Sequence, residues 1–136
     1  MDDIKQQVRP GERIYMEDAS GLMALLSGRT FVSGDGLVNS NEYLHAYLMP
    51  GRVADYLRDK HIEYFLTSNI QCYPYRKRMP WTRNVELDKA GYRVVVDTRY
   101  SGWLPIVPSV LHFPVSSLVF DKCSNGIREL LFRVPQ

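Results

Sequence analysis

Three polar residues, Asp18, Asp35 and Asn39, have the types and spacing that could do chemistry. Asp18 ends an apolar run that begins at Arg13, and Asp35 and Asn39 follow the run that begins at Thr30. If both runs are parallel strands, their carboxyl ends share the sheet edge where α/β proteins usually bind ligands. Carboxylates there could bind a cation or hydroxyl groups, or act as acid and base. The structural alternative is that these residues form turns and cap helices.

A loop of interleaved basic and aromatic residues, CYPYRKRMPWTR, is the second candidate. This pattern suits a lipid headgroup layer, and it could also stack and pair with single-stranded nucleic acid. The structural alternative is a solvated loop whose rings pack on the sheet. The net charge is only +2, so we predict no nucleic-acid partner. The predicted contacts with membrane or lipid phosphate are Tyr75, Arg76, Lys77, Arg78 and Trp81.

Familiar catalytic and cofactor motifs are missing from the sequence. GLMALLSGR has two glycines but no lysine–serine pair, so it is not a P-loop, and there is no GxSxG elbow. His45, His61 and His112 are scattered, and the two cysteines lack CxxC spacing. We therefore predict no catalytic residue, no cofactor and no metal for this chain by itself.

The two cysteines, Cys72 and Cys123, stand about 50 residues apart. They are either two unrelated buried thiols or the partners of one disulfide. A disulfide would require an oxidising compartment. The sequence leaves both possibilities open, because it does not give the separation of the two residues.

The elements that must position the candidate residues alternate in the first half of the chain. Residues 1–12 form a polar lead-in, and the single domain is predicted over 13–136. Val53, Tyr56 and Leu57 have the spacing of a core-facing helical stripe. Strands are predicted at Arg13–Asp18, Thr30–Ser33 and Ile62–Thr67, and helices at Gly21–Leu26 and Arg52–Lys60. A further helix is predicted to run through Leu48 from a cap at Ser40 or Asn41.

The second half consists of strands joined by loops. Asn84–Ala90 is polar and turn-prone, and a Ser-Asn-Gly turn separates the last two apolar runs. Strands are predicted at Tyr92–Thr98, Val115–Asp121 and Glu129–Val134. The pattern indicates an α/β, three-layer domain with a mixed sheet. Its first half would hold parallel βαβ units, and its C-terminus an antiparallel hairpin.

Composition bounds the class of protein. The chain has 136 residues, of which 45% are hydrophobic and 24% charged, as in an ordinary globular domain. It holds no run of ~18 apolar residues and no apolar signal core at its N-terminus. We expect a soluble, untargeted domain, and a fragment of a larger protein would look the same.

The order of motifs resembles the soluble C-terminal domain of certain bacterial multi-pass membrane glycosyltransferases. The matching strings cover a little over a third of the chain well. They are Asp18 with Gly21, Leu26–Ser27–Gly28–Arg29, Asp35–Gly36–Leu37–Val38–Asn39–Ser40, Pro50–Gly51–Arg52 and Tyr56–Leu57. One departure is Ser20, which stands where the family has an aspartate–alanine–glycine turn.

The resemblance implies a role outside the cytoplasm. Members of this family are similar to mannosyltransferases that use polyprenyl-phosphate sugars and place their catalytic residues on the membrane portion. By this resemblance the chain is a non-catalytic accessory domain in the periplasm or on the outer face of the inner membrane. Its partners would be the transmembrane portion of the same polypeptide, and lipid headgroups or a lipid-linked sugar. The resemblance also permits a Cys72–Cys123 disulfide.

Two alternatives come from other functional classes. One is a free-standing small α/β enzyme that acts through Asp18 and Asp35. The other is a protein–protein interaction module. Codons that encode transmembrane segments upstream of Asp2 would exclude the free-standing enzyme.

Overall fold

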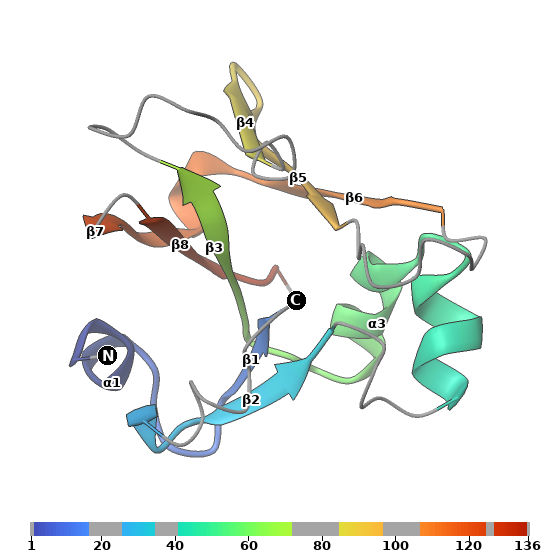
Figure 1. Ribbon diagram of the computed structural model, residues 1–136, viewed down its shortest axis with the longest axis horizontal. Coiled ribbons are helices and arrows are strands. Elements are labelled where there is room, and N and C mark those ends of the chain that lie inside the picture. The colour runs from blue at the N-terminus through green and yellow to red at the C-terminus, as the bar shows by residue number, and fades with distance from the viewer. Residues whose placement is uncertain are drawn as a thin grey trace.

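The computed structural model describes residues 2–16, 26–34, 41–71, 85–96, 107–124 and 127–135. Within these residues the fold is a mixed α/β fold in which strands predominate (Figure 1). The helical elements are α1 (Asp2–Gln7), the π-helix η1 (Tyr43–Leu48), α3 (Val53–Asp59) and the 3-10 turn η4 (Val115–Ser117). The strands are β1 (Arg13–Met16), β2 (Thr30–Ser33), β3 (Tyr64–Gln71), β4 (Val85–Asp88), β5 (Gly91–Val96), β6 (Ser109–Phe113), β7 (Leu118–Ser124) and β8 (Ile127–Arg133).

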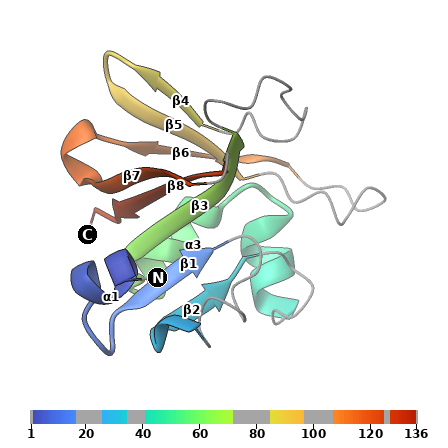
Figure 2. The same cartoon turned by 60° about the vertical axis from the view of Figure 1, so that its left-hand side comes forward.

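The strands form two sheets (Figure 2). Sheet A has the order β2-β1-β3-β8-β7, and sheet B has the order β4-β5-β6. In sheet A, β1 pairs in parallel with both β2 and β3, whereas β8 runs antiparallel to β3 and β7. The predicted mixed sheet is therefore present, and its parallel strands come from the first half of the chain.

The centre of sheet A is buried on both faces, which explains the apolar residues at the start of β3. Phe65 faces a large cluster, and its neighbours Tyr64 and Leu66 face a smaller one. The smaller cluster lies against α1, through Ile4 and Val8, both 1% exposed. The segment that was expected to be a polar lead-in therefore includes a helix that packs against sheet A.

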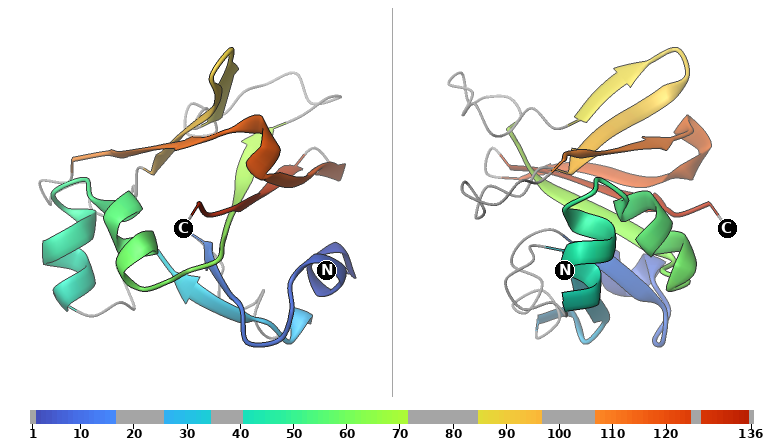
Figure 3. Two further views of the ribbon diagram at one scale, coloured as in Figure 1. Left: turned by 180° about the vertical axis from the view of Figure 1, so that it is seen from behind. Right: turned by 90° about the vertical axis from the view of Figure 1, so that its right-hand side faces the viewer.

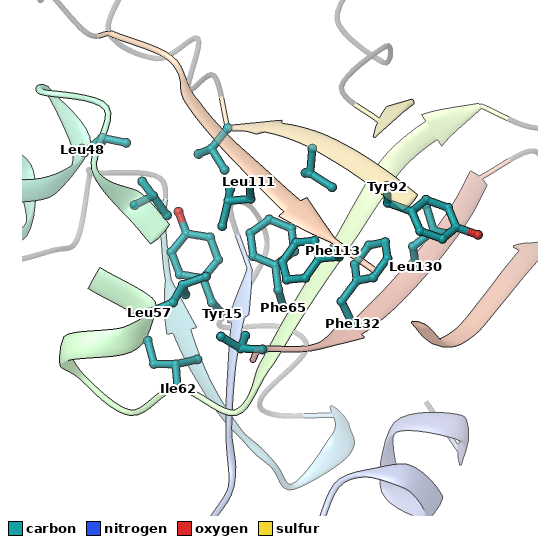
Figure 4. Close-up of a cluster of buried hydrophobic side chains, with 14 of the residues drawn as sticks. Tyr15, Leu48, Leu57, Ile62, Phe65, Tyr92, Leu111, Phe113, Leu130 and Phe132 are labelled. Carbon is teal, nitrogen blue, oxygen red and sulfur yellow. The ribbon is translucent and has the colours of Figure 1, made fainter. Parts of the chain in front are cut away.

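The large cluster is rich in aromatic rings and lies between the two sheets and the helices η1 and α3 (Figure 4). Phe113 of sheet B stacks on Phe132 of sheet A, with ring centroids 4.5 Å apart. Tyr92 meets the same Phe132 edge-on at 5.1 Å. The helices η1 and α3 lie away from α1, on the far side of sheet A (Figure 3).

Sheet B differs from the sequence-based expectation. Residues 84–90 were expected to be a polar turn, but Val85–Asp88 is the strand β4. Its residues are mostly exposed, and it pairs only with β5 in the described part of the chain, so its sequence lacks the apolar pattern of a buried strand. The strand β6 was not predicted either. In the structure Ser109, Leu111 and Phe113 are buried, and the two residues between them are exposed.

Candidate functional site

The candidate site is the edge of sheet A at the carboxyl ends of β1 and β2. Met16 and Ser33, the last residues of the two strands, are register partners. The next residue of the second chain segment, Gly34, donates its N–H to the carbonyl of Met16 at 2.9 Å. Both segments therefore leave the sheet from neighbouring positions, as the parallel arrangement predicts.

The predicted ligand contacts follow directly from these two positions. Asp18 comes two residues after Met16, and Asp35 comes one residue after Gly34. Asp18, Asp35 and Asn39 themselves lie outside the described residues, as does the helix expected over Gly21–Leu26 apart from its last residue. The structure shows that the chain leaves this edge at Met16 and Gly34. Ligand contact by the three side chains stays a prediction.

A buried hydrogen-bonded chain forms the base of this edge. The Tyr43 hydroxyl donates to the Gly34 carbonyl at 2.9 Å. The hydroxyls of Tyr15 and Tyr43 are also 2.9 Å apart, and because a phenol has one proton, Tyr15 is the donor of that bond. These bonds join β1, the end of β2 and the start of η1.

Gly34 is required for this packing because a side chain there has no room. A Cβ atom at Gly34 would lie 2.2 Å from the ring and hydroxyl of Tyr15. This glycine, one residue before Asp35, therefore has a packing role. Sequence reasoning missed Tyr15 as part of this edge, because Tyr15 and Gly34 meet only when β1 pairs with β2.

Tyrosine rings from η1 and α3 pack against one another beside this edge. Tyr56 meets Tyr43 edge-on at 4.6 Å and Tyr47 at 5.1 Å. Burial raises the pKa of Tyr56 above its ordinary value. Burial also raises the pKa of Tyr47, as does its hydrogen bond to Asp59. Both phenols stay protonated at neutral pH, so both rings act here as packing groups, and the Tyr47 hydroxyl also donates a hydrogen bond.

The second predicted surface lies outside the described residues. This holds for Tyr75, Arg76, Lys77, Arg78 and Trp81, and for Cys72 at the start of that loop. Cys123 on β7 is disulfide-bonded. Cys72 is the only other cysteine in the sequence. Of the two possibilities that the sequence left open, the bonded state of Cys123 favours the disulfide.

The described part of the chain contains neither a cluster of metal-ligating side chains nor a membrane-spanning helix. There, no group of three or more His, Cys, Asp or Glu side chains is arranged to hold a metal ion. No helix in the same residues is long and apolar enough to cross a membrane.

Comparison of the chain with protein families, curated proteins and solved structures gave no match.

Proposed function

We propose that this chain is a non-catalytic extracytoplasmic domain of a membrane-bound, mannosyltransferase-like glycosyltransferase of a bacterium. In this proposal the domain contacts the acceptor, a lipid phosphate or the membrane surface, and the transmembrane portion of the same polypeptide carries the chemistry. The three-layer arrangement with a C-terminal hairpin is part of the proposal.

One observation supports the proposal most. The segments that carry the family-like motifs, Asp18 to Gly21 and Asp35 to Ser40, leave sheet A from neighbouring positions at Met16 and Gly34. Motifs far apart in sequence would then serve one ligand surface at the edge of a sheet. Asp18, Asp35 and Asn39 are the proposed ligand contacts on that surface.

The location outside the cytoplasm has separate support. Cys123 is disulfide-bonded, and structural disulfides persist in oxidising compartments such as the bacterial periplasm. A domain held close to the outer face of the inner membrane would turn a basic, aromatic surface to the lipid headgroups. The proposed surface is the loop that contains Arg76, Lys77, Arg78 and Trp81.

The membrane contact is tested by sedimentation of the chain with vesicles of phosphatidylglycerol and phosphatidylcholine. We expect binding that weakens as salt rises, because exposed charges are screened within about 8 Å at physiological ionic strength. Charge reversal at Arg76, Lys77 and Arg78 should abolish it. The matched control reverses Arg9, Lys89 and Arg93, which are basic residues outside the loop, and should retain most of it. Equal loss in both variants would refute a specific role for the loop.

The free-standing enzyme is distinguished by the reading frame and by topology. The proposal expects transmembrane segments encoded upstream of Asp2. It also expects a reporter enzyme fused after Gln136 of the complete gene product to be active only outside the cytoplasm. A reporter active in the cytoplasm would overturn the proposed location.

A further inference from the structure

A pocket of about 390 Å³ opens at the opposite end of sheet A from the candidate site. It lies at the amino ends of β1 and β3, beside the end of β8 and the turn η4. Its volume is in the range of small-molecule sites. The polar and aromatic residues in its wall are Glu12, Glu63, Tyr64, Ser116, Ser117 and Arg133.

The two carboxylates of the pocket are held by backbone N–H groups. Glu63 accepts a hydrogen bond from the N–H of Arg13 at 2.6 Å. Glu12 accepts one from the N–H of Arg9 at 2.9 Å, and its carboxylate lies 4.0 Å from the Arg9 guanidinium. The bonds fix both acids in place, and each carboxylate has lone pairs left for a ligand.

The positive charge of the pocket is Arg133. Its guanidinium lies over the ring of Tyr64, 5.6 Å from the ring centroid, and that ring is 3% exposed. Within the described residues Arg133 forms no ion pair, although two carboxylates line the same pocket. Arg133 is exposed, so an anionic group can reach the planar fork of N–H donors on its guanidinium.

Two hydroxyls stand in the same wall as this cation. Ser116 and Ser117 belong to η4, which is closed by the bond from the N–H of Ser117 to the carbonyl of Pro114 at 2.9 Å. Arg133 and the two serines offer several donors to one oxyanion.

We propose that this pocket binds a small zwitterion whose anionic group contacts Arg133 and the serine hydroxyls, and whose primary ammonium group contacts Glu63 and Glu12. Arg133 is exposed and the two glutamates are half-buried, so this binding should weaken as salt rises. A simple anion would be repelled by the carboxylates, and a simple cation by Arg133. A zwitterion supplies an anionic group for Arg133 and an ammonium group for the two glutamates. The same chemistry occurs in free phosphoethanolamine and in the headgroup of phosphatidylethanolamine.

The test is titration of the isotope-labelled chain with phosphoethanolamine, followed by shifts of the amide signals of the pocket residues. We expect saturable shifts at Ser116, Ser117 and Arg133. Phosphocholine should bind about tenfold more weakly, because its trimethylated nitrogen donates no hydrogen bond to a carboxylate. Inorganic phosphate and ethanolamine should each bind more weakly still.

Variants assign the effect to the pocket. Arg133→Gln should weaken phosphoethanolamine binding about tenfold or more, since it removes a charged donor. The matched control is Arg93→Gln, an exposed arginine on sheet B that should bind as the parent does. Glu12→Gln should weaken binding of phosphoethanolamine more than that of phosphate, with Glu86→Gln as its control. Unfolding curves of each variant verify that it is folded.

The proposal is overturned if phosphoethanolamine shifts no pocket signal, or if phosphate alone binds equally well. Vesicles of phosphatidylcholine with and without phosphatidylethanolamine then identify the source of the ligand. Binding that requires phosphatidylethanolamine assigns the headgroup, and binding of the free compound alone assigns a soluble zwitterion. Charge reversal at Arg76, Lys77 and Arg78 should leave these shifts unchanged, so this inference and the proposed function fail independently.

Discussion

At the scale of single residues, packing determines the role of Gly34. This glycine stands between β2 and Asp35, one of the predicted ligand contacts. Its absent side chain makes room for the Tyr15 ring. Neither residue suggests the other in the sequence, because Tyr15 lies in β1 and Gly34 follows β2, and they meet only when the two strands pair.

A stability prediction at this scale concerns His61. It has a φ angle of 53° directly after α3, where the N–H groups of His61 and Ile62 bond to the carbonyls of Arg58 and Leu57. This is the hydrogen bonding of a Schellman cap, whose left-handed residue is usually glycine. A histidine at this position therefore carries the steric cost of a left-handed backbone conformation.

We expect His61→Gly to raise the free energy of unfolding by about 0.5–1 kcal/mol, because glycine adopts a positive φ angle without the steric penalty of a Cβ atom. Urea denaturation measures the change. Lys60→Gly is the control, since Lys60 has a φ angle of −95° and gains nothing from glycine. A destabilised His61→Gly chain would contradict this explanation.

At the scale of elements, periodicity in the sequence predicted the helices and strands that have a strong apolar pattern and missed the strands that lack one. The helix expected over Arg52–Lys60 is α3, with Val53 and Leu57 buried as the stripe requires. The expected strand at Ile62–Thr67 is β3, which begins at Tyr64 and extends to Gln71. By contrast β4 has mostly exposed residues, so its pairing with β5 could not be read from its own composition.

Helix α1 depends on a distant arginine. A helix of six residues is marginal in water by itself. The Arg29 guanidinium donates to the carbonyl of Val8 at 2.7 Å and to that of Lys5 at 2.9 Å, which satisfies carbonyl groups at and just after the end of α1. Arg29 belongs to the Ser-Gly-Arg string of the family resemblance, so part of that string has a structural role.

We expect Arg29→Ala to lower the free energy of unfolding by about 1–3 kcal/mol, the loss of charged hydrogen bonds, and to speed hydrogen exchange in α1 before the rest of the chain. Denaturant unfolding and amide exchange measure the two effects. Arg9→Ala is the control, because its side chain is 86% exposed and its ion pair with Glu12 spans 4.0 Å. That variant should change stability by less than about 0.5 kcal/mol. Equal effects of the two variants would exclude the capping role.

At the scale of the whole molecule, the disulfide of Cys123 links the fold to its compartment. Because Cys72 is the only other cysteine, we predict that the bond closes a loop of about 50 residues. A loop of that length constrains the unfolded chain, so reduction should lower the free energy of unfolding by about 2–4 kcal/mol.

Thiol titration in denaturant should find no free thiol in the oxidised chain and two after reduction. The double variant with Cys72→Ser and Cys123→Ser should unfold like the reduced chain, with or without reductant. If reduction leaves the unfolding midpoint unchanged, the disulfide has no structural role.

The sequence by itself determined the mixed α/β class, the parallel strands of the first half and the polar segments that follow them. Each of these depends on local signals: apolar periodicity, glycine and the position of small polar residues. Only the tertiary structure decided that Tyr15, Gly34 and Tyr43 form one hydrogen-bonded base, that a second sheet covers the aromatic core, and that Arg133 lies near Glu63. These contacts join residues far apart in the chain, and their pairing depends on packing that no local pattern records.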